Sequence, residues 1–247
     1  MNQRQRKIID LLDGRNEASV SELAGLLRVS AVTVRQDLSY LQDEGFLQRI
    51  HGGAVLRSAD DISKRLVLNY DKKLAIALRA ADFIDRDETI LIESGSTNAI
   101  LVKELGRRPN VNVITTNAFI AQQLKKSAQA NIILLGGIYQ HESDSLVGQL
   151  TKLCLEHVHF SKAFVGVDGY TIESGFTSAD MQRAEISGLI ARKSNEVFVL
   201  TDSSKFGRVH LATLFRPDDI THLVTDSGIP EREQRYLQNQ QVEVVVV

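Results

Sequence analysis

The feature that most constrains this chain is a change in the spacing of its apolar residues after about residue 57. Before that point, apolar residues recur at the three- and four-residue spacing of short helices. From residue 70 onward, short runs rich in β-branched residues alternate with helical stretches, which is typical of a mainly parallel sheet covered on both faces. The sequence therefore predicts a small helical module at 1–57, a polar linker at 58–69 and a larger α/β domain at 70–247.

Seven short runs in the larger domain are expected to be strands. They are 89–93, 111–115, 131–135, 162–167, 196–200, 220–225 and 242–247. Helical patterns separate most of them, and an apolar stripe precedes the first, formed by Leu74, Ala77, Leu78, Ala81 and Ile84. Ligands of such sheets bind beyond the carboxyl ends of the strands, so the residues after each strand are candidates for a ligand site.

The N-terminal module has the outline of a winged helix-turn-helix. Ser19 and Glu22 have the spacing of a capping box that starts a second helix. Ser30 is expected to cap a third helix that runs to residue 44, and Gly45 is placed to end it. Residues 46–55 are expected to form a small β-hairpin. In a winged helix-turn-helix the third helix enters the major groove of DNA, where Arg and Gln bind guanine and adenine.

Val34, Leu38 and Leu41 are expected to face the core, which leaves the polar residues of the third helix for DNA. The expected DNA-contacting residues are Ser30, Thr33, Arg35, Gln36, Ser39, Arg49, His51, Gly52 and Gly53. A packing module that does not contact nucleic acid is the alternative. Residues 1–57 contain eight basic and seven acidic residues, so a single copy would attract phosphate weakly. DNA binding would then need several linked copies, which predicts a homo-oligomer, a dimer or a tetramer.

Composition excludes several classes of protein. A formal net charge of −2 argues against a protein coated with a nucleic-acid-binding surface, although it allows one small DNA-binding module. No apolar run approaches the roughly 18 residues that span a bilayer. The N-terminus lacks the apolar stretch of a secretory signal, so we expect a cytoplasmic protein with no membrane partner. The single cysteine, Cys154, excludes an internal disulfide and a cysteine-rich metal site, and neither a metal nor a cofactor is expected.

Small and polar residues follow five of the expected strands. They are Glu93, Ser94, Gly95, Ser96 and Thr97, then Thr116 and Asn117, Gly136 and Gly137, Asp168, and Lys205. Glycine allows close approach of the backbone, and a helix N-terminus or a lysine favours an anion. Such loops are also rich in these residues for turns and helix caps. Their repetition over five loops nevertheless predicts a small, polar, anionic ligand.

Two sets of motifs resemble a known family. Ser30-Ala31-Val32-Thr33-Val34-Arg35-Gln36-Asp37-Leu38 and Arg49-Ile50-His51-Gly52-Gly53-Ala54 are similar to the N-terminal signature of DeoR-type bacterial transcription regulators. Glu93–Thr97, Val165–Gly169 and Asp202–Phe206 are similar to the second half of that family. The resemblance implies a winged helix that binds operator DNA and a sensor domain resembling ribose-5-phosphate isomerase. It further implies an oligomeric repressor of carbohydrate-metabolism genes that a phosphorylated sugar releases.

Three positions depart from the family pattern. Glu93 stands where the family usually has Asp, Gln140 where many members have Arg, and Gln36 where a second Arg is frequent. Without a cation at position 140, two alternatives remain: the effector is not an ordinary sugar phosphate, or its phosphate is anchored by Lys205 and residues 94–97 instead. Gln36 is expected to change the operator sequence more than DNA binding itself.

The alternative function is that of a sugar-phosphate isomerase, which needs a carboxylate base beside its substrate. Asp168 and Glu185 are the candidates for that role, and Glu185 also belongs to the expected effector-binding residues. The related isomerases have a second acidic pair and a Lys-Gly-Gly run after the Asp-Gly step, whereas this chain continues Tyr170-Thr171-Ile172-Glu173. We therefore expect no enzymatic activity, because function depends on the site and not on the fold.

Overall fold

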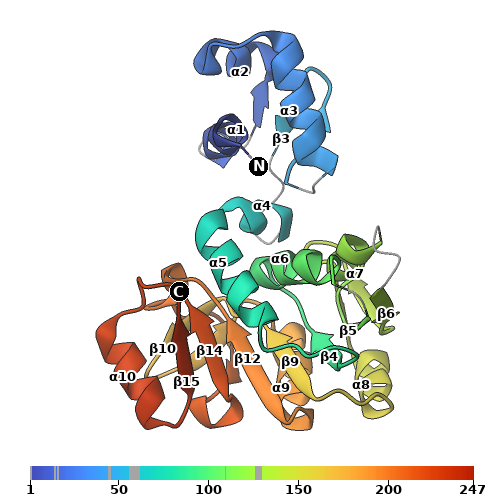
Figure 1. The fold of residues 1–247 in the computed structure, drawn as a ribbon, viewed down its shortest axis with the longest axis vertical. Helices are drawn as coiled ribbons and strands as arrows, with labels where there is room; N and C mark the ends of the chain where they lie inside the picture. Colours follow the sequence, from blue (N-terminus) through green and yellow to red (C-terminus); the bar gives the residue numbers. More distant parts are fainter. Residues whose placement is uncertain are drawn as a thin grey trace. The chain divides into compact units, whose positions relative to one another are not determined.

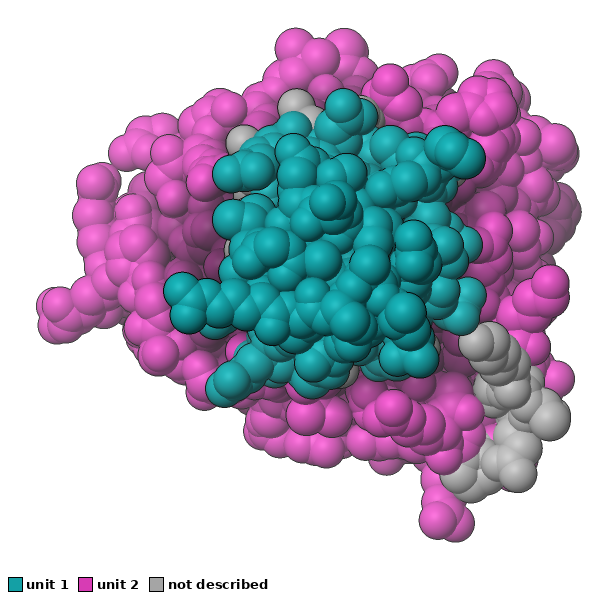
Figure 2. Space-filling model, turned by 90° about the horizontal axis from the view of Figure 1, so that it is seen from above, with its two compact units in different colours: residues 1–68 teal, residues 69–247 magenta. Residues whose placement is uncertain are grey.

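The computed structural model describes residues 2–13, 15, 17–43, 46–55, 62–108, 110–125 and 130–247 (Figure 1). The chain forms two compact units, Met1–Leu68 and Asn69–Val247, which Figure 2 colours separately. Among the described residues, no helix combines the length and the apolar character needed to cross a membrane.

The first unit combines helices with a small antiparallel sheet. Its elements are α1 (Gln3–Asp13), β1 (Glu17–Ser19), α2 (Val20–Leu27), α3 (Ala31–Asp43), β2 (Gln48–Ile50), β3 (Gly53–Val55) and α4 (Ile62–Val67). The sheet has the order β1-β3-β2, so the predicted hairpin is confirmed and β1 adds a strand that was not predicted. Ile8 and Leu12 of α1, Leu23 of α2, and Val34 and Leu38 of α3 are fully buried and form the core.

Both predicted helix caps of this unit are confirmed. The Ser19 hydroxyl accepts a hydrogen bond from the Glu22 N–H, and the Glu22 carboxylate accepts one from the Ser19 N–H at 2.8 Å. The Ser30 hydroxyl accepts from the Thr33 N–H at 3.1 Å, so Ser30 caps α3. These bonds satisfy backbone donors that lack partners in the first turn of a helix. The predicted end of α3 at residues 44 and 45 lies outside the described residues.

The segment that we expected to be a polar linker, 58–69, contains a helix. Residues 62–67 form α4, and residues 58–61 lie outside the described residues. Ile62 and Leu66 are buried, and α4 contacts α1. Two apolar residues four positions apart, Ile62 and Leu66, are too few to show a helical period in the sequence, which explains why α4 was not predicted.

The second unit is built on a seven-stranded parallel sheet, as predicted. The strands are β4 (Thr89–Ile92), β5 (Val111–Thr115), β6 (Ala130–Leu134), β9 (Lys162–Val165), β12 (Glu196–Leu200), β14 (His222–Thr225) and β15 (Glu243–Val246). The sheet order is β15-β14-β12-β9-β4-β5-β6. The chain runs from β4 towards one edge and then from β9 towards the other. The switch point at which open α/β sheets bind ligands therefore lies between β4 and β9.

Helices cover both faces of this sheet (Figure 1). They are α5 (Tyr70–Ala81), α6 (Ser96–Leu105), α7 (Ala118–Leu124), α8 (Gln149–Glu156), α9 (Met181–Lys193) and α10 (Glu231–Asn239), with short 3-10 helices at Ser203–Lys205 and Pro217–Asp219. Right-handed crossovers in opposite directions along the sheet place α6 and α7 on one face and α8, α9 and α10 on the other. Beside the main sheet lie a hairpin of β7 (Ile138–Gln140) and β8 (Ser145–Val147) and a small sheet of β10 (Gly169–Thr171), β11 (Gly175–Ser178) and β13 (Ala212–Phe215).

The predicted apolar stripe of α5 is partly wrong. Leu78, which we expected to be buried, is 47% exposed, whereas Lys73, Ile76 and Ala80 are buried. The Lys73 ammonium lies 3.9 Å from the Asp202 carboxylate, also buried. Because this ion pair allows a lysine on the inner face, the buried face of α5 is rotated from the one that apolar spacing alone predicts.

Candidate DNA-binding surface and ligand site

Helix α3 presents its polar residues on the side away from the core. Arg35 and Gln36 are exposed, and Thr33 and Ser39 are partly buried. Val34, Leu38 and Leu41 are fully buried, as predicted, and they fix which side of the helix faces outward. The structure thus brings the expected contact residues of α3 onto one accessible surface, with Ser30 exposed just before the first turn.

The hairpin of β2 and β3 is fastened to one flank of α3, beside its outward side. The Arg49 guanidinium donates to the Ser39 hydroxyl at 2.8 Å, and the Arg49 N–H donates to the side-chain oxygen of Gln42 at 2.9 Å. His51 and Gly52 form the exposed turn of the hairpin, where Gly52 has a φ of 78° that favours glycine. A side chain on Gly53 would overlap the Ala18 carbonyl. Gly52 and Gly53 therefore have a structural reason to be glycine.

Asp37 lies on the opposite flank of α3, and its role was not predicted. Its carboxylate is buried and accepts hydrogen bonds from Arg4 Nε at 2.5 Å, Arg4 Nη2 at 3.2 Å and Gln5 Nε2 at 3.1 Å. These bonds join α3 to the first turn of α1. The two hydrogen bonds from Arg4 are the stronger ones, because both their donor and their acceptor are charged. The orientation of α3 therefore depends on a polar contact as well as on its apolar core.

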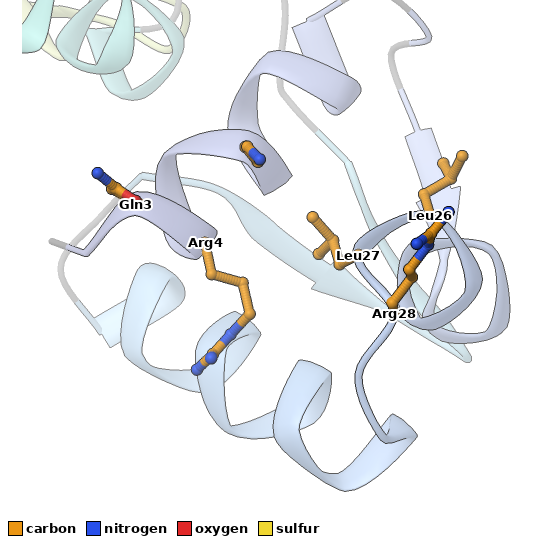
Figure 3. A pocket seen from close by; sticks show the side chains of 6 residues that line it. Gln3, Arg4, Leu26, Leu27 and Arg28 are labelled. Atoms are coloured by element: carbon orange, nitrogen blue, oxygen red, sulfur yellow. The ribbon is translucent and has the colours of Figure 1, made fainter.

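A basic groove lies between the first turns of α1 and the end of α2 (Figure 3). It has a volume of about 400 Å³ and is lined by Gln3, Arg4, Lys7, Leu26, Leu27 and Arg28. Figure 3 shows Arg4 extending from α1 towards α3 and Arg28 at the end of α2. The described lining residues carry three positive charges and no negative one.

In the second unit, the loops after β4 and β9 meet at the switch point of the sheet. A Cβ atom on Gly166 would lie 2.8 Å from the Ser94 carbonyl oxygen and 3.4 Å from the Gly95 Cα. Gly95 has a φ of 111°, which also favours glycine, and it directly precedes α6. Ser96 and Thr97, in the first turn of α6, are buried beside these loops. The two loops can therefore approach each other only because both contain glycine.

Three buried charged side chains gather near these loops. The Glu93 carboxylate accepts a hydrogen bond from the Ser94 hydroxyl at 2.9 Å. Asp168 accepts from the Ala179 N–H at 2.9 Å, and Arg183 Nη2 lies 3.8 Å from the Asp168 carboxylate. Burial raises the pKa of Glu93, against the opposing effects of the Ser94 hydrogen bond and the charge of Arg183. Among the described residues, the buried Nε of Arg183 has no hydrogen-bond partner.

Arg183 was not predicted as part of this site. It lies on α9, which Asp180 caps by accepting from the Arg183 N–H at 2.7 Å. Gln140 also reaches this helix end, where its Nε2 donates to Asp180 at 3.2 Å. Position 140, which departs from the family pattern, therefore faces the first turn of α9, the turn that also contains Arg183.

Several expected ligand-binding residues have structural roles in the fold. The Asn117 side chain caps α7 by accepting from the Ile120 N–H at 3.0 Å, and it donates to the Ser143 carbonyl at 2.8 Å. Thr116 is buried, and its carbonyl accepts from the Leu146 N–H at 2.7 Å. The Gly136 carbonyl accepts from the Thr151 hydroxyl at 2.9 Å, and a side chain on Gly137 would overlap that hydroxyl.

Lys205 lies in the loop after β12, which is fastened to the start of α5. The buried Asp202 carboxylate accepts from the Asn69 amide at 3.1 Å, and the Lys72 ammonium lies 2.7 Å from Asp226. Burial alone would raise the pKa of Asp226, but hydrogen bonds from Lys72, Ser203 and Gly228 lower it to about 2.

Glu185 is not brought into the buried cluster. Its side chain is 57% exposed and forms an ion pair with Lys152 of α8. It lies two positions after Arg183 on α9, and a helix places residues that are two positions apart on different sides.

Comparison with known proteins matches both units. The model of the DeoR-like helix-turn-helix domain matches residues 4–60, and the model of the DeoR C terminal sensor domain matches residues 68–227. The HTH-type transcriptional regulator GolR of Listeria innocua is 35% identical over 231 residues, which cover 92% of this chain and 91% of that protein. The lactose phosphotransferase system repressor of Streptococcus mutans is 30% identical, with 94% and 95% covered. Among solved structures, ribose 5-phosphate isomerase A of Methanocaldococcus jannaschii has a TM-score of 0.42 at 21% identity, and the match covers 56% of this chain and 55% of that one.

Proposed function

This chain belongs to the DeoR family of transcriptional regulators, and we propose that it represses genes of carbohydrate metabolism until a small anionic effector releases it from operator DNA. We propose residues 1–57 as the DNA-binding domain and residues 70–247 as the domain for effector sensing and oligomerisation. A repressor role and a link to sugars are supported by the name of the lactose phosphotransferase system repressor. The similar proteins are named as regulators, and this chain is a regulator and not an enzyme.

The observation that carries the DNA-binding part of the proposal is the accessible polar face of α3. Arg35 and Gln36 are exposed there, on the side away from the buried Val34, Leu38 and Leu41. We propose that Thr33, Arg35 and Gln36 contact bases, because Arg and Gln bind guanine and adenine bidentately in the major groove. Arg49 and His51 would then contact the DNA backbone from the hairpin.

The test is an electrophoretic retardation assay with DNA fragments that the wild-type chain selects from its own genome. Arg35→Ala is expected to abolish retardation while the circular dichroism spectrum and effector binding are unchanged. Arg86→Ala, which removes an exposed arginine of the second unit, is the matched control and should bind as the wild type does. Unchanged retardation by Arg35→Ala would refute the assignment of α3.

For the effector, we propose a phosphorylated sugar bound between the ends of β4 and β9. The charges support this choice, because Glu93 and Asp168 can accept hydrogen bonds from sugar hydroxyls. Arg183 and Lys205, with the start of α6, can stabilise a phosphate. Titration calorimetry with a panel of hexose and pentose phosphates should find a ligand whose binding is lost in Lys205→Met. A panel in which the unphosphorylated sugars bind equally well would contradict the anionic effector.

We also propose that the chain is a homo-oligomer whose interface includes the free edge of the sheet at β6. Six large apolar side chains there are 41–63% exposed, namely Ile133, Leu134, Ile138, Tyr139, Leu150 and Leu153. Contacts link part of this set, because Leu150 lies over Gly136 and Ile138 lies over Gly148. We propose that the six side chains form one apolar patch at this edge. If a large side chain offers roughly 200 Å² when fully exposed, the patch presents about 600 Å², against the roughly 800 Å² per partner of a standard interface.

A second copy related by a two-fold axis would place identical apolar patches against each other without opposing like charges. β6 itself contains no charged residue or proline that would protect a free edge from pairing. Sedimentation velocity should therefore show that Leu150→Glu lowers the oligomeric state. Leu211→Glu, at an exposed leucine outside the patch, should leave the oligomeric state unchanged. A monomeric wild type, or an unchanged Leu150→Glu variant, would contradict the proposal.

A further inference from the structure

Helix α3 is held on two flanks by different parts of the first unit. On one flank, Ser39 accepts a hydrogen bond from Arg49 of the hairpin, and on the other, Asp37 accepts from Arg4 of α1. Ser39 and Asp37 are two positions apart, which corresponds to about 200° around a helix with 3.6 residues per turn. The hairpin and the first turn of α1 therefore lie on roughly opposite sides of α3.

The flank formed by α1 carries the basic groove described above. Arg4 and Lys7 are three positions apart and thus share a face of α1. Arg28 ends α2 with a φ of 54° and stands three positions before Ala31, the first residue of α3. Lys7 and Arg28 are exposed, and neither forms an ion pair with another described residue. Arg4 is the exception, because it is engaged with Asp37.

We propose that Lys7 and Arg28 bind phosphates of the DNA backbone on the side of α3 opposite the hairpin, and that Arg4 is a positioning residue that holds α3 beside them. This proposal rests on the proposed function, in which α3 enters the major groove. A helix in the major groove has a row of phosphates on each side, and contacts to both rows fix its position. The hairpin supplies Arg49 for one row, and the basic groove supplies cations for the other.

The charge balance of the first unit gives this position its importance. Residues 1–57 exceed electrical neutrality by only one positive charge, so affinity for phosphate depends on where the cations gather. The basic groove brings Lys7 and Arg28 together beside the Arg4–Asp37 ion pair, with Gln3 as a further hydrogen-bond donor. A phosphodiester carries a negative charge, opposite to that of these side chains, and it can accept hydrogen bonds from both lysine and arginine. Contacts of this kind carry no sequence information.

The test measures operator affinity by fluorescence anisotropy over a series of salt concentrations. The double variant Lys7→Gln/Arg28→Gln is expected to reduce the slope of log affinity against log salt by about 1.8 per DNA-bound subunit, since each phosphate contact contributes about 0.9. It should weaken binding to operator and to unrelated DNA by the same factor. The charge-conserving double variant Lys7→Arg/Arg28→Lys should retain the wild-type slope. That result would show that the reduced slope of Lys7→Gln/Arg28→Gln is caused by the loss of charge.

The matched control is Arg86→Gln/Lys125→Gln, which removes two exposed cations of the second unit and should leave the slope unchanged. An unchanged slope in Lys7→Gln/Arg28→Gln, or the same reduction in the control, would overturn the proposal. Arg35→Ala distinguishes base contacts from phosphate contacts. It should lose the preference for operator over unrelated DNA while retaining the wild-type slope on unrelated DNA. If the wild-type chain bound no DNA, the proposed function would fail instead.

Discussion

Asp37→Asn removes the charge of the buried carboxylate that joins α3 to α1, with little change in side-chain volume. The wild-type carboxylate accepts three hydrogen bonds, two from Arg4 and one from Gln5. A hydrogen bond to a charged group contributes about 1.5–3 kcal/mol. Arg4 is 37% exposed and can be solvated once the charge is lost, so the expected loss is near the lower end, about 2 kcal/mol.

Hydrogen–deuterium exchange measured by mass spectrometry localises this loss. Amides of α3 exchange when the first unit opens, and in the variant this opening should cost about 2 kcal/mol less. Because 1.4 kcal/mol changes an equilibrium constant by a factor of ten, these amides should exchange about 30-fold faster. Amides of β12 should be unaffected, because they belong to the second compact unit. The control is Asp43→Asn, at the exposed last residue of α3. Exchange in α3 that stays at the wild-type rate in Asp37→Asn, or rises equally in Asp43→Asn, would refute the reasoning.

Two further substitutions test the second unit. Asp226→Asn should lower the free energy of unfolding by about 1–2 kcal/mol at pH 7. The hydrogen bonds of the folded state lower the Asp226 pKa from 3.8 to about 2. Urea titrations should therefore show the difference from wild type intact above pH 4 and disappearing as the pH falls to 2. Gly166→Ala should cost about 1–3 kcal/mol and weaken sugar-phosphate binding in calorimetry, because its Cβ would lie 2.8 Å from the Ser94 carbonyl. Gly25→Ala, in open space on α2, is the control and should not destabilise the protein.

The features that the sequence predicted well depend on neighbouring residues. The caps formed by Ser19 and Ser30 involve residues three positions away, and this spacing is visible in the sequence. The central strands β4, β9, β12 and β14 of the parallel sheet are almost wholly buried, so each appears as a short apolar run between helices. The outward side of α3 followed from the spacing of Val34, Leu38 and Leu41.

What the sequence could not predict depends on contacts between distant residues. Asp37 and Arg4 are 33 positions apart, and nothing near Asp37 shows that a guanidinium would cover it. Arg183 is a similar case, because an arginine in the first turn of a polar helix is normally exposed to solvent. Glu185 is the opposite case, because it lies on a different side of α9 from Arg183 and pairs there with Lys152 of α8. Strand-end residues such as Asn117 and Gly137 serve the fold through contacts that a ligand-site pattern does not distinguish.

The measurement that tests the central claim most directly is the operator affinity of the full-length chain with and without the sugar phosphate that calorimetry identifies. Coupling between two sites is typically about 1–3 kcal/mol, so saturating effector should weaken operator binding by about 5- to 150-fold. The same effector should leave the affinity of Lys205→Met for operator unchanged. Equal operator affinity of the wild-type chain with and without bound effector would contradict the claim that effector binding releases this regulator from operator DNA.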